Sequence, residues 1–164
     1  MTTKPPADEV APATAALLEL LERERVSVEL LPHSRTTTAA SEAKALGIVP
    51  QTVAKTVVLE GEASKLRAVV PASMHVDLVK LAELAGTRVR QLTEDELAGE
   101  YPEFELGAVP PFGGPAGDRV VVDRHVTEMD HVVLEGGVHD ASLRMAADDL
   151  VAVAHAEVAD IARP

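Results

Sequence analysis

The chain has 164 residues, of which 46% are hydrophobic, and this is enough for one domain with a substantial core. It contains no cysteine, which excludes disulfides, thiol nucleophiles and zinc sites built from thiolates. One tyrosine, two phenylalanines and a net charge of −12 argue against a surface that coats nucleic acid or stacks its bases.

The charges are unevenly distributed along the chain. Residues 33–92 carry 8 basic and 5 acidic side chains, whereas residues 93–164 carry 4 basic and 16 acidic ones. A local anion site in the basic segment is therefore compatible with an acidic whole. The first 16 residues lack the apolar core of a secretion signal, and no apolar run approaches the roughly 20 residues of a membrane span. We expect a cytoplasmic protein that binds no membrane.

The chain is predicted to begin with a tail, a helix and a strand. Residues 1–12 are rich in proline and threonine and predict a disordered tail, so that residues 13–164 form one domain. Leucines spaced among glutamate and arginine predict an amphipathic helix over 14–25, capped near Thr14. Alternation of apolar and polar residues predicts a strand over 26–31.

A polar loop and a second helix follow. His33 to Thr38 contains three threonines, one of which can cap a helix over 39–46. Glu42 is placed for a capping box, and Gly47 suits the end of the helix. His33 on this polar loop is either an exposed surface residue or part of a functional site, and the loop sequence leaves both open.

Residues 53–59 form the most informative segment, a short β-branched run that predicts a buried strand. It contains one cation, Lys55. An ammonium group in a dry core without a partner costs several kcal/mol or shifts its pKa. Lys55 therefore either reaches the solvent or faces a wet cavity that attracts anions. Gly61 predicts a hairpin turn, with the return strand over 65–70.

The middle of the chain predicts two more helices and a strand. Ser73 is the expected cap of a helix over 75–85. A short strand is predicted over 87–92. Thr93 and Glu96 have the spacing of a capping box, which predicts a brief helix after them.

The segment 107–114, with the sequence Gly-Ala-Val-Pro-Pro-Phe-Gly-Gly, combines prolines that fix φ with glycines that allow unusual conformations. It predicts either a shaped loop that closes over a pocket or a plain wide turn. The C-terminal part predicts three strands, over 118–123, 131–135 and 141–145, with a turn over 136–140 between the last two. A helix over 148–153 and a further turn over 158–161 are predicted to follow. Together the elements predict an α/β (α+β) fold with a mixed, largely antiparallel sheet rather than a doubly wound one.

Two kinds of hydrolase have little support in the sequence. Three late histidines lie near aspartates, but their spacing matches no metal motif, with neither HExxH nor a helical i, i+4 pair. A serine esterase would need a GxSxG elbow, which is absent.

Several segments together resemble the YbaK/ProX/EbsC family, also known as the aminoacyl-tRNA deacylase or prolyl-tRNA synthetase-associated domain. They run in the family's order over nearly the whole chain, from about residue 14 to 162. The main ones are His33 with Thr37 and Thr38, Ala-Lys-Thr-Val-Val at 54–58, Val-Val-Pro-Ala at 69–72, Glu-Leu-Gly-Ala-Val-Pro-Pro-Phe-Gly at 105–113, and Glu-Gly-Gly-Val-His at 135–139. The Ala-Lys-Thr strand together with the Gly-x-x-Pro loop is a specific pair.

The resemblance implies a mixed, barrel-like sheet with surrounding short helices, and hydrolysis in trans of the ester that joins a wrong amino acid to the 3′ end of a tRNA. It implies that Lys55 binds the tRNA end and that Gly107 lies where the ester carbonyl is held. His139 is a third candidate catalytic residue, which orients water or the amino group or else is a structural turn residue. The resemblance implies no metal or cofactor. The expected substrate-binding residues are His33, Thr37, Thr38, Val109, Pro110, Phe112, Gly113 and Gly137.

Several alternatives stay open at this point. The wrong amino acid is alanine, cysteine or serine, with tRNA(Pro) as a candidate tRNA and prolyl-tRNA synthetase as a candidate partner; DNA is not expected as a partner. The fold could instead serve a module that binds the tRNA end or a synthetase without turnover. A metal-dependent hydrolase is the third possibility.

Overall fold

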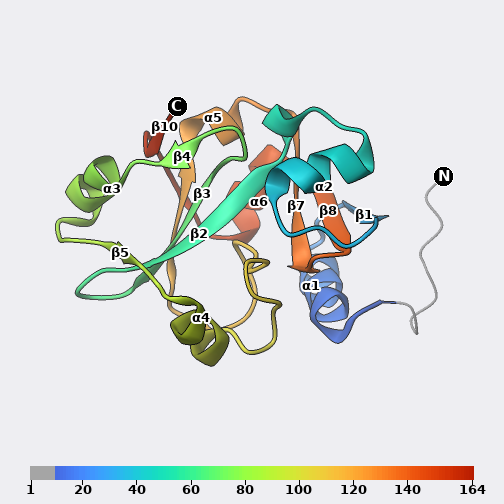
Figure 1. Cartoon of the computed structure of the whole chain (residues 1–164), viewed down its shortest axis with the longest axis horizontal. Coiled ribbons are helices and arrows are strands. Elements are labelled where there is room, and N and C mark those ends of the chain that lie inside the picture. The colour runs from blue at the N-terminus through green and yellow to red at the C-terminus, as the bar shows by residue number, and fades with distance from the viewer. Residues whose placement is uncertain (1–9) are drawn as a thin grey trace.

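The computed structural model describes residues 10–164, so residues 1–9 of the predicted tail lie outside the described part. In chain order the elements are α1 (Pro12–Arg23), β1 (Val28–Pro32), α2 (Ala39–Leu46), η2 (Pro50–Thr52), β2 (Ala54–Glu60), β3 (Lys65–Pro71), β4 (His75–Val76), α3 (Leu78–Ala85), β5 (Arg90–Gln91), α4 (Glu94–Glu100), β6 (Arg119–Asp123), α5 (Arg124–Thr127), β7 (His131–Val138), β8 (Ala141–Ala146), α6 (Ala147–Val153), β9 (Glu157–Ala159) and β10 (Ala162–Arg163). Figure 1 shows the long β2–β3 hairpin crossing the molecule, with α2 near one end and α3 near the other.

The larger sheet has five strands in the order β5-β2-β3-β6-β9. β2 and β3 form the predicted antiparallel hairpin, which places Lys55 opposite Val70. β3 pairs with β6 in parallel, and β6 pairs with β9 in parallel. Valine-rich strands suit these central positions because both faces of the sheet are covered.

The smaller sheet has three antiparallel strands in the order β1-β8-β7. A parallel bridge between Val53 and Val133 joins its edge to the start of β2. The prediction of a mixed sheet with surrounding short helices is thus confirmed, although the strands do not form a closed barrel. β4 and β10 pair separately with each other.

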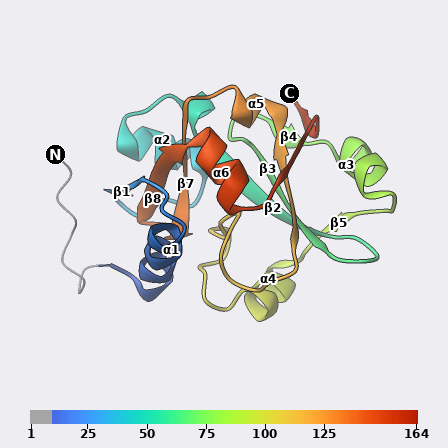
Figure 2. The ribbon, with the colours of Figure 1, turned by 180° about the vertical axis from the view of Figure 1, so that it is seen from behind.

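The main core lies between the two sheets and under two helices. α1 contributes Leu17 and Leu21, and α6 contributes Leu150; all three are buried. Figure 2 shows α1 and α6 on the face opposite to the one seen in Figure 1. A second core cluster, which includes Leu81 and Ile161, packs around α3. No helix in the described part of the chain is long and apolar enough to cross a membrane.

Local predictions were wrong around the third helix. α3 begins at Leu78, and Asp77 caps it by accepting hydrogen bonds from the amides of Val79 and Lys80. Ser73 is not the cap, because the intervening residues His75 and Val76 form β4, which pairs with β10. The strand predicted over 87–92 is only two residues long.

Three other corrections concern chain ends and turns. α1 begins at Pro12, and Thr14, the expected cap, is buried and donates a hydrogen bond to the carbonyl of Gly136. β7 continues through two glycines predicted to be a turn, because a bulge between Glu135 and Val138 absorbs them. The segment expected as a terminal turn, 158–161, begins instead inside the strand β9, which the parallel pairing with β6 holds in place.

The second helix has the predicted start but a different capping partner. Thr38 is the N-cap of α2 and accepts a hydrogen bond from the amide of Ser41, whose hydroxyl completes the capping box. Glu42 is not the capping partner, because its side chain turns into the protein, where it is fully buried. Gly47 ends the helix with φ at 67°, as predicted.

Candidate functional site

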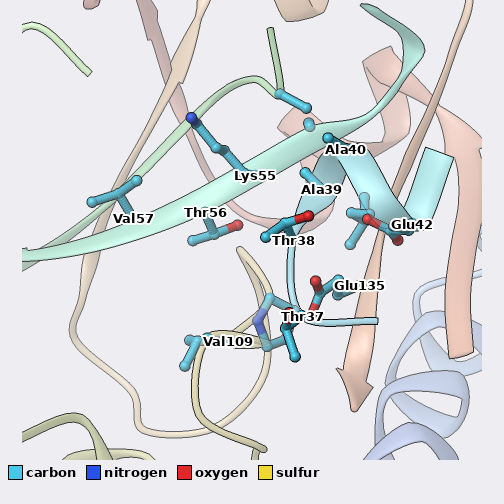
Figure 3. A pocket seen from close by; sticks show the side chains of 15 residues that line it. Thr37, Thr38, Ala39, Ala40, Glu42, Lys55, Thr56, Val57, Val109 and Glu135 are labelled. Carbon is cyan, nitrogen blue, oxygen red and sulfur yellow. The ribbon is translucent and has the colours of Figure 1, made fainter. Parts of the chain in front are cut away.

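A pocket of about 360 Å³ opens beside β2 where α2, β7 and the segment 107–110 converge. Figure 3 shows how its side chains come from these four separate parts of the chain. It is lined by Thr37, Thr38, Ala39, Ala40, Glu42, Ala54, Lys55, Thr56, Val57, Ala72, Gly107, Val109, Pro110, Leu134 and Glu135. The pocket therefore combines one lysine, two glutamates and three threonines with an apolar surround.

Lys55 supplies the cation of this pocket. It is half-buried on β2, and burial lowers its pKa. No carboxylate among residues 10–164 forms an ion pair with it. A cation that is partly desolvated and not neutralised by a neighbour is available to an anionic ligand.

Lys55 also borders a second hollow, of about 560 Å³, which it shares with Val57. His75, Gln91 and Arg163 lie along that hollow. The ammonium group thus stands between two concave surfaces, and a ligand that extends past Lys55 has space on both sides.

The segment 107–114 is a shaped loop, and Arg67 holds it. Arg67 lies on β3 with 2% of its side chain exposed, and its guanidinium donates to the carbonyls of Pro110 and Gly113 at 2.8 and 2.9 Å. The same guanidinium pairs with Asp118 at 2.9 Å and lies 5.1 Å from the ring centre of Tyr101. The two prolines have no backbone N–H, so the loop offers fewer donors to its own carbonyls. The buried guanidinium of Arg67 supplies the donors that these carbonyls need.

Gly107 lies where this loop meets the pocket. Its φ is 83°, a conformation that side chains disfavour, so a glycine is required for the turn. The Ala108 amide already donates to the carbonyl of Glu105, at 2.9 Å. The Gly107 amide donates to no backbone or side-chain acceptor of the described residues.

His139 lies behind Gly107 rather than in the pocket lining. Its Nε2 donates to the carbonyl of Leu106 at 2.6 Å, and its Nδ1 is 3.1 Å from a carboxyl oxygen of Glu135. Its backbone amide donates to Glu105 at 2.7 Å. The imidazole is buried and supports the start of the loop from below.

The structure brings together six of the eleven residues that the sequence singled out. Lys55, Gly107, Thr37, Thr38, Val109 and Pro110 line the pocket. His33 lies outside it and contacts Ser142 at 2.9 Å. Phe112 is buried in the core, and a side chain on Gly113 or Gly137 would meet Leu17 or Phe104, so these three residues fix the loop and strand rather than line the pocket.

The late histidines do not converge on one point. His125 contacts Asp123, whereas His131 is exposed at the opposite end of β7 from the turn that holds His139. Among residues 10–164 no three metal-binding side chains are grouped as a metal site would need.

Sequence reasoning missed Glu42, Glu135 and Arg67. Burial, with the nearby charges of Glu42 and Glu105, raises the pKa of Glu135 to about 8. Burial likewise raises the pKa of Glu42. An arginine inside the apolar run of β3 could have been noticed by the reasoning applied to Lys55, whereas only the fold places the two glutamates in one pocket.

The sequence profile of the aminoacyl-tRNA editing domain matches residues 33–153. The chain is also 36% identical, over 135 residues, to a proline–tRNA ligase from Stenotrophomonas maltophilia (strain K279a). The match covers 76% of this chain and 22% of the ligase, so the chain corresponds to about a fifth of that protein's length.

Solved structures share the whole fold. One, described as a candidate trans-editing enzyme for prolyl-tRNA synthetase, is 28% identical, with a TM-score of 0.84 and coverage of 95% of this chain and 100% of the other. A hypothetical protein is 27% identical with the same TM-score, over 90% of this chain and 99% of the other.

Proposed function

We propose that this chain, which belongs to the family of aminoacyl-tRNA editing domains and is an aminoacyl-tRNA deacylase, acts in trans on tRNA that carries a wrong amino acid. Alanine, serine and cysteine are the candidate amino acids. A pocket of about 360 Å³ that must also hold part of the terminal ribose leaves room for a small side chain. Similarity to a proline–tRNA ligase and to a candidate trans-editing enzyme makes tRNA(Pro) the first tRNA to test.

Lys55 binds the 3′ end of the tRNA in this proposal. Its ammonium has no ion-pair partner in the described part of the chain and borders hollows on two sides. A phosphate paired with Lys55 would leave the terminal ribose and its ester over the smaller pocket, and the preceding nucleotide over the larger hollow. A charged hydrogen bond of this kind contributes about 1.5–3 kcal/mol.

The loop amide at Gly107 stabilises the oxyanion that forms when water attacks the ester carbonyl. Its N–H is free of backbone acceptors within residues 10–164, and the positive φ of Gly107 sets its direction. A donor aimed at a developing oxyanion contributes roughly 3–4 kcal/mol.

Water, rather than an enzyme nucleophile, attacks the ester. No serine lines the pocket, and Ser142 is fully buried in a hydrogen bond to Glu42. An aminoacyl ester is already activated, so positioning and oxyanion stabilisation are sufficient. The threonines at the entrance, or a hydroxyl of the ribose, orient the water.

The observation that carries this proposal is Lys55, which has no ion-pair partner within residues 10–164 and lies beside the Gly107 loop, and its test is deacylation by single variants. Wild type is assayed on tRNA(Pro) charged with alanine, serine, cysteine or proline. We expect Lys55→Ala to lower kcat/KM by about 10- to 150-fold. Lys65→Ala is the matched control, since Lys65 lies on the same hairpin but pairs with Glu100 outside the pocket.

Release of one amino acid, with loss in Lys55→Ala only and no effect of a chelator, would establish the substrate and the role of Lys55. A rate that a chelator abolishes would point to the metal-dependent alternative. Binding of charged tRNA without release from any substrate would contradict turnover on this panel and indicate a binding module.

A further inference from the structure

Two buried carboxyl groups form one wall of the proposed ester pocket. Glu42 is fully buried on α2, and Glu135 on β7 keeps 15% of its side chain exposed. In Figure 3 both lie on the side of the pocket away from the Lys55 ammonium. Neither Oε1 of Glu42 nor Oε2 of Glu135 has a hydrogen-bond partner within the described residues. Buried carboxyl oxygens without a partner are costly, so they require an explanation.

Oε2 of Glu135 faces Nδ1 of His139, and neither atom has a hydrogen-bond partner within the described residues. The carbonyl of Leu106 can only accept a hydrogen bond, so Nε2 of His139 must carry a proton. Nδ1 then faces the Glu135 carboxyl at 3.1 Å without forming a hydrogen bond, so two unsatisfied polar atoms lie side by side in the wall.

Glu42 is in a comparable position. Ser142 lies between Glu42 and His33, and its one hydroxyl proton cannot serve both contacts. The carbonyl of Ser34 takes the proton on Nδ1 of His33. Oε1 of Glu42 is left without a partner within the described residues, so this side of the wall also has an unused acceptor.

The positions of these groups fit the amino group of an aminoacyl ester. The ring of His139 touches both Glu135 and Gly107, since a Cβ built on Gly107 would lie 3.6 Å from its Cε1. The α-amino nitrogen of an aminoacyl ester lies two covalent bonds from the carbonyl carbon, about 2.5 Å away. Because Gly107 and Glu135 line the same pocket, the nitrogen of an ester whose carbonyl oxygen is held at the Gly107 amide can reach Glu135.

We infer that Glu135, supported by Glu42, binds the free α-ammonium group of the aminoacyl ester, which makes a free amino group a condition for hydrolysis. This inference rests on the proposed function. The ammonium supplies the hydrogen-bond donors that the carboxyl oxygens of the wall lack. Lys55 and Glu135 would then recognise opposite charges of one substrate, the tRNA phosphate and the amino acid nitrogen.

The first test compares alanyl-tRNA with N-acetyl-alanyl-tRNA, which lacks the charge but keeps the ester. We expect wild type to prefer the free amine by at least about tenfold in kcat/KM, and Glu135→Gln to reduce this preference to about twofold or less. Glu157→Gln, an exposed change on β9, should keep the wild-type ratio. Glu42→Gln is a second variant in case Glu135→Gln does not fold, and we expect it to lower the ratio too.

A binding measurement separates this inference from the proposed function. The probe is 3′-alanylamino-3′-deoxyadenosine, whose amide bond replaces the ester, compared with its N-acetyl derivative by calorimetry. Tighter binding of the free amine, lost in Glu135→Gln, would support the inference even if no tRNA were deacylated. Equal binding or equal hydrolysis of the two forms by wild type, or an unchanged preference in Glu135→Gln, would overturn it while leaving deacylation intact.

Discussion

Two cations on neighbouring strands have different roles because their surroundings differ. Arg67 has all of its guanidinium nitrogens satisfied by loop carbonyls and Asp118, so it stabilises structure. Lys55 has no ion-pair partner in residues 10–164 and lines a pocket, so it is available to a ligand. A planar guanidinium suits several fixed acceptors, whereas an ammonium is a point charge that a phosphate can meet from many directions.

The first residue-scale prediction concerns Arg67. Arg67→Met removes a buried cation, leaves two loop carbonyls without their donor and leaves the Asp118 carboxylate without its counter-ion, so we expect a loss of roughly 3–5 kcal/mol in the free energy of unfolding. Urea unfolding measures this value. Arg119→Met is the control, because Arg119 forms an exposed ion pair with Glu157 and should cost less than about 1 kcal/mol. Equal effects of the two changes would contradict the role assigned to Arg67.

The second concerns Glu135, whose pKa is raised to about 8 by burial and by the nearby charges of Glu42 and Glu105. The unfolded chain releases this proton near pH 4.3, whereas the folded protein keeps it to about pH 8. The free energy of unfolding therefore falls as pH rises between these values. We expect Glu135→Gln to be more stable than wild type by roughly 1–3 kcal/mol at pH 7.5 and about equal at pH 4. A difference that does not change with pH would rule this out.

At the scale of elements, the loop from Gly107 to Gly114 is fixed from three sides. Arg67 binds its carbonyls, His139 supports its start, and Phe112 anchors it in the core. Gly113 packs so closely on Leu17 of α1 that a Cβ would come within 2.7 Å of that side chain. A loop held this firmly can present a backbone amide in a constant direction, which oxyanion stabilisation requires.

Alanine substitutions at Gly107 in this loop and at Gly117, which lies just after it, test whether this direction matters. Gly107 and Gly117 both have positive φ, 83° and 97°, so either change should cost about 1–2 kcal/mol of stability. Only Gly107 lines the pocket. We expect Gly107→Ala to reduce deacylation more than tenfold beyond its effect on folding, and Gly117→Ala to leave the kcat of the folded fraction unchanged. Similar losses of kcat in both would argue against a role for the Gly107 amide.

At the scale of the whole molecule, a net charge of −12 opposes contact with a polyanion. Binding of tRNA must then depend on a few phosphates at the basic segment rather than on a broad surface. The ion-paired arginines support this view, since Arg90 and Arg119 are already neutralised by glutamates.

The salt dependence of tRNA binding measures the number of these phosphates. For a single-stranded 3′ end we expect a slope of log K against log[salt] of about −1 to −2, which corresponds to two or three phosphates. Lys55→Ala should make the slope shallower by about 0.7. The slope is obtained from equilibrium constants for tRNA binding, measured at KCl concentrations from about 50 to about 300 mM. A slope steeper than about −4 would show that a wide surface takes part.

By itself the sequence determined the elements whose signals are local. The hairpin around Gly61, the capping box at Thr93 and the start of α2 formed where turn and cap chemistry predicted them, because they depend on residues within a few positions. Lys55 and the Gly-Pro loop could also be recognised from the sequence, because a charge in an apolar strand and a loop rich in proline and glycine are unusual in any fold.

Only the tertiary structure decided which side chains meet. β9 and β4 exist because distant partners pair with them, which no local propensity could indicate. His139 lies behind the pocket and Glu135 lines it, although both belong to one short segment, because the bulge in β7 changes which side chains face the cavity. The sequence predicted that Glu42 is a capping residue. In the structure its side chain points inward and accepts a hydrogen bond from Ser142 on β8. Contacts between residues about 100 positions apart depend on the complete fold, and the acidic wall of the pocket is such a contact.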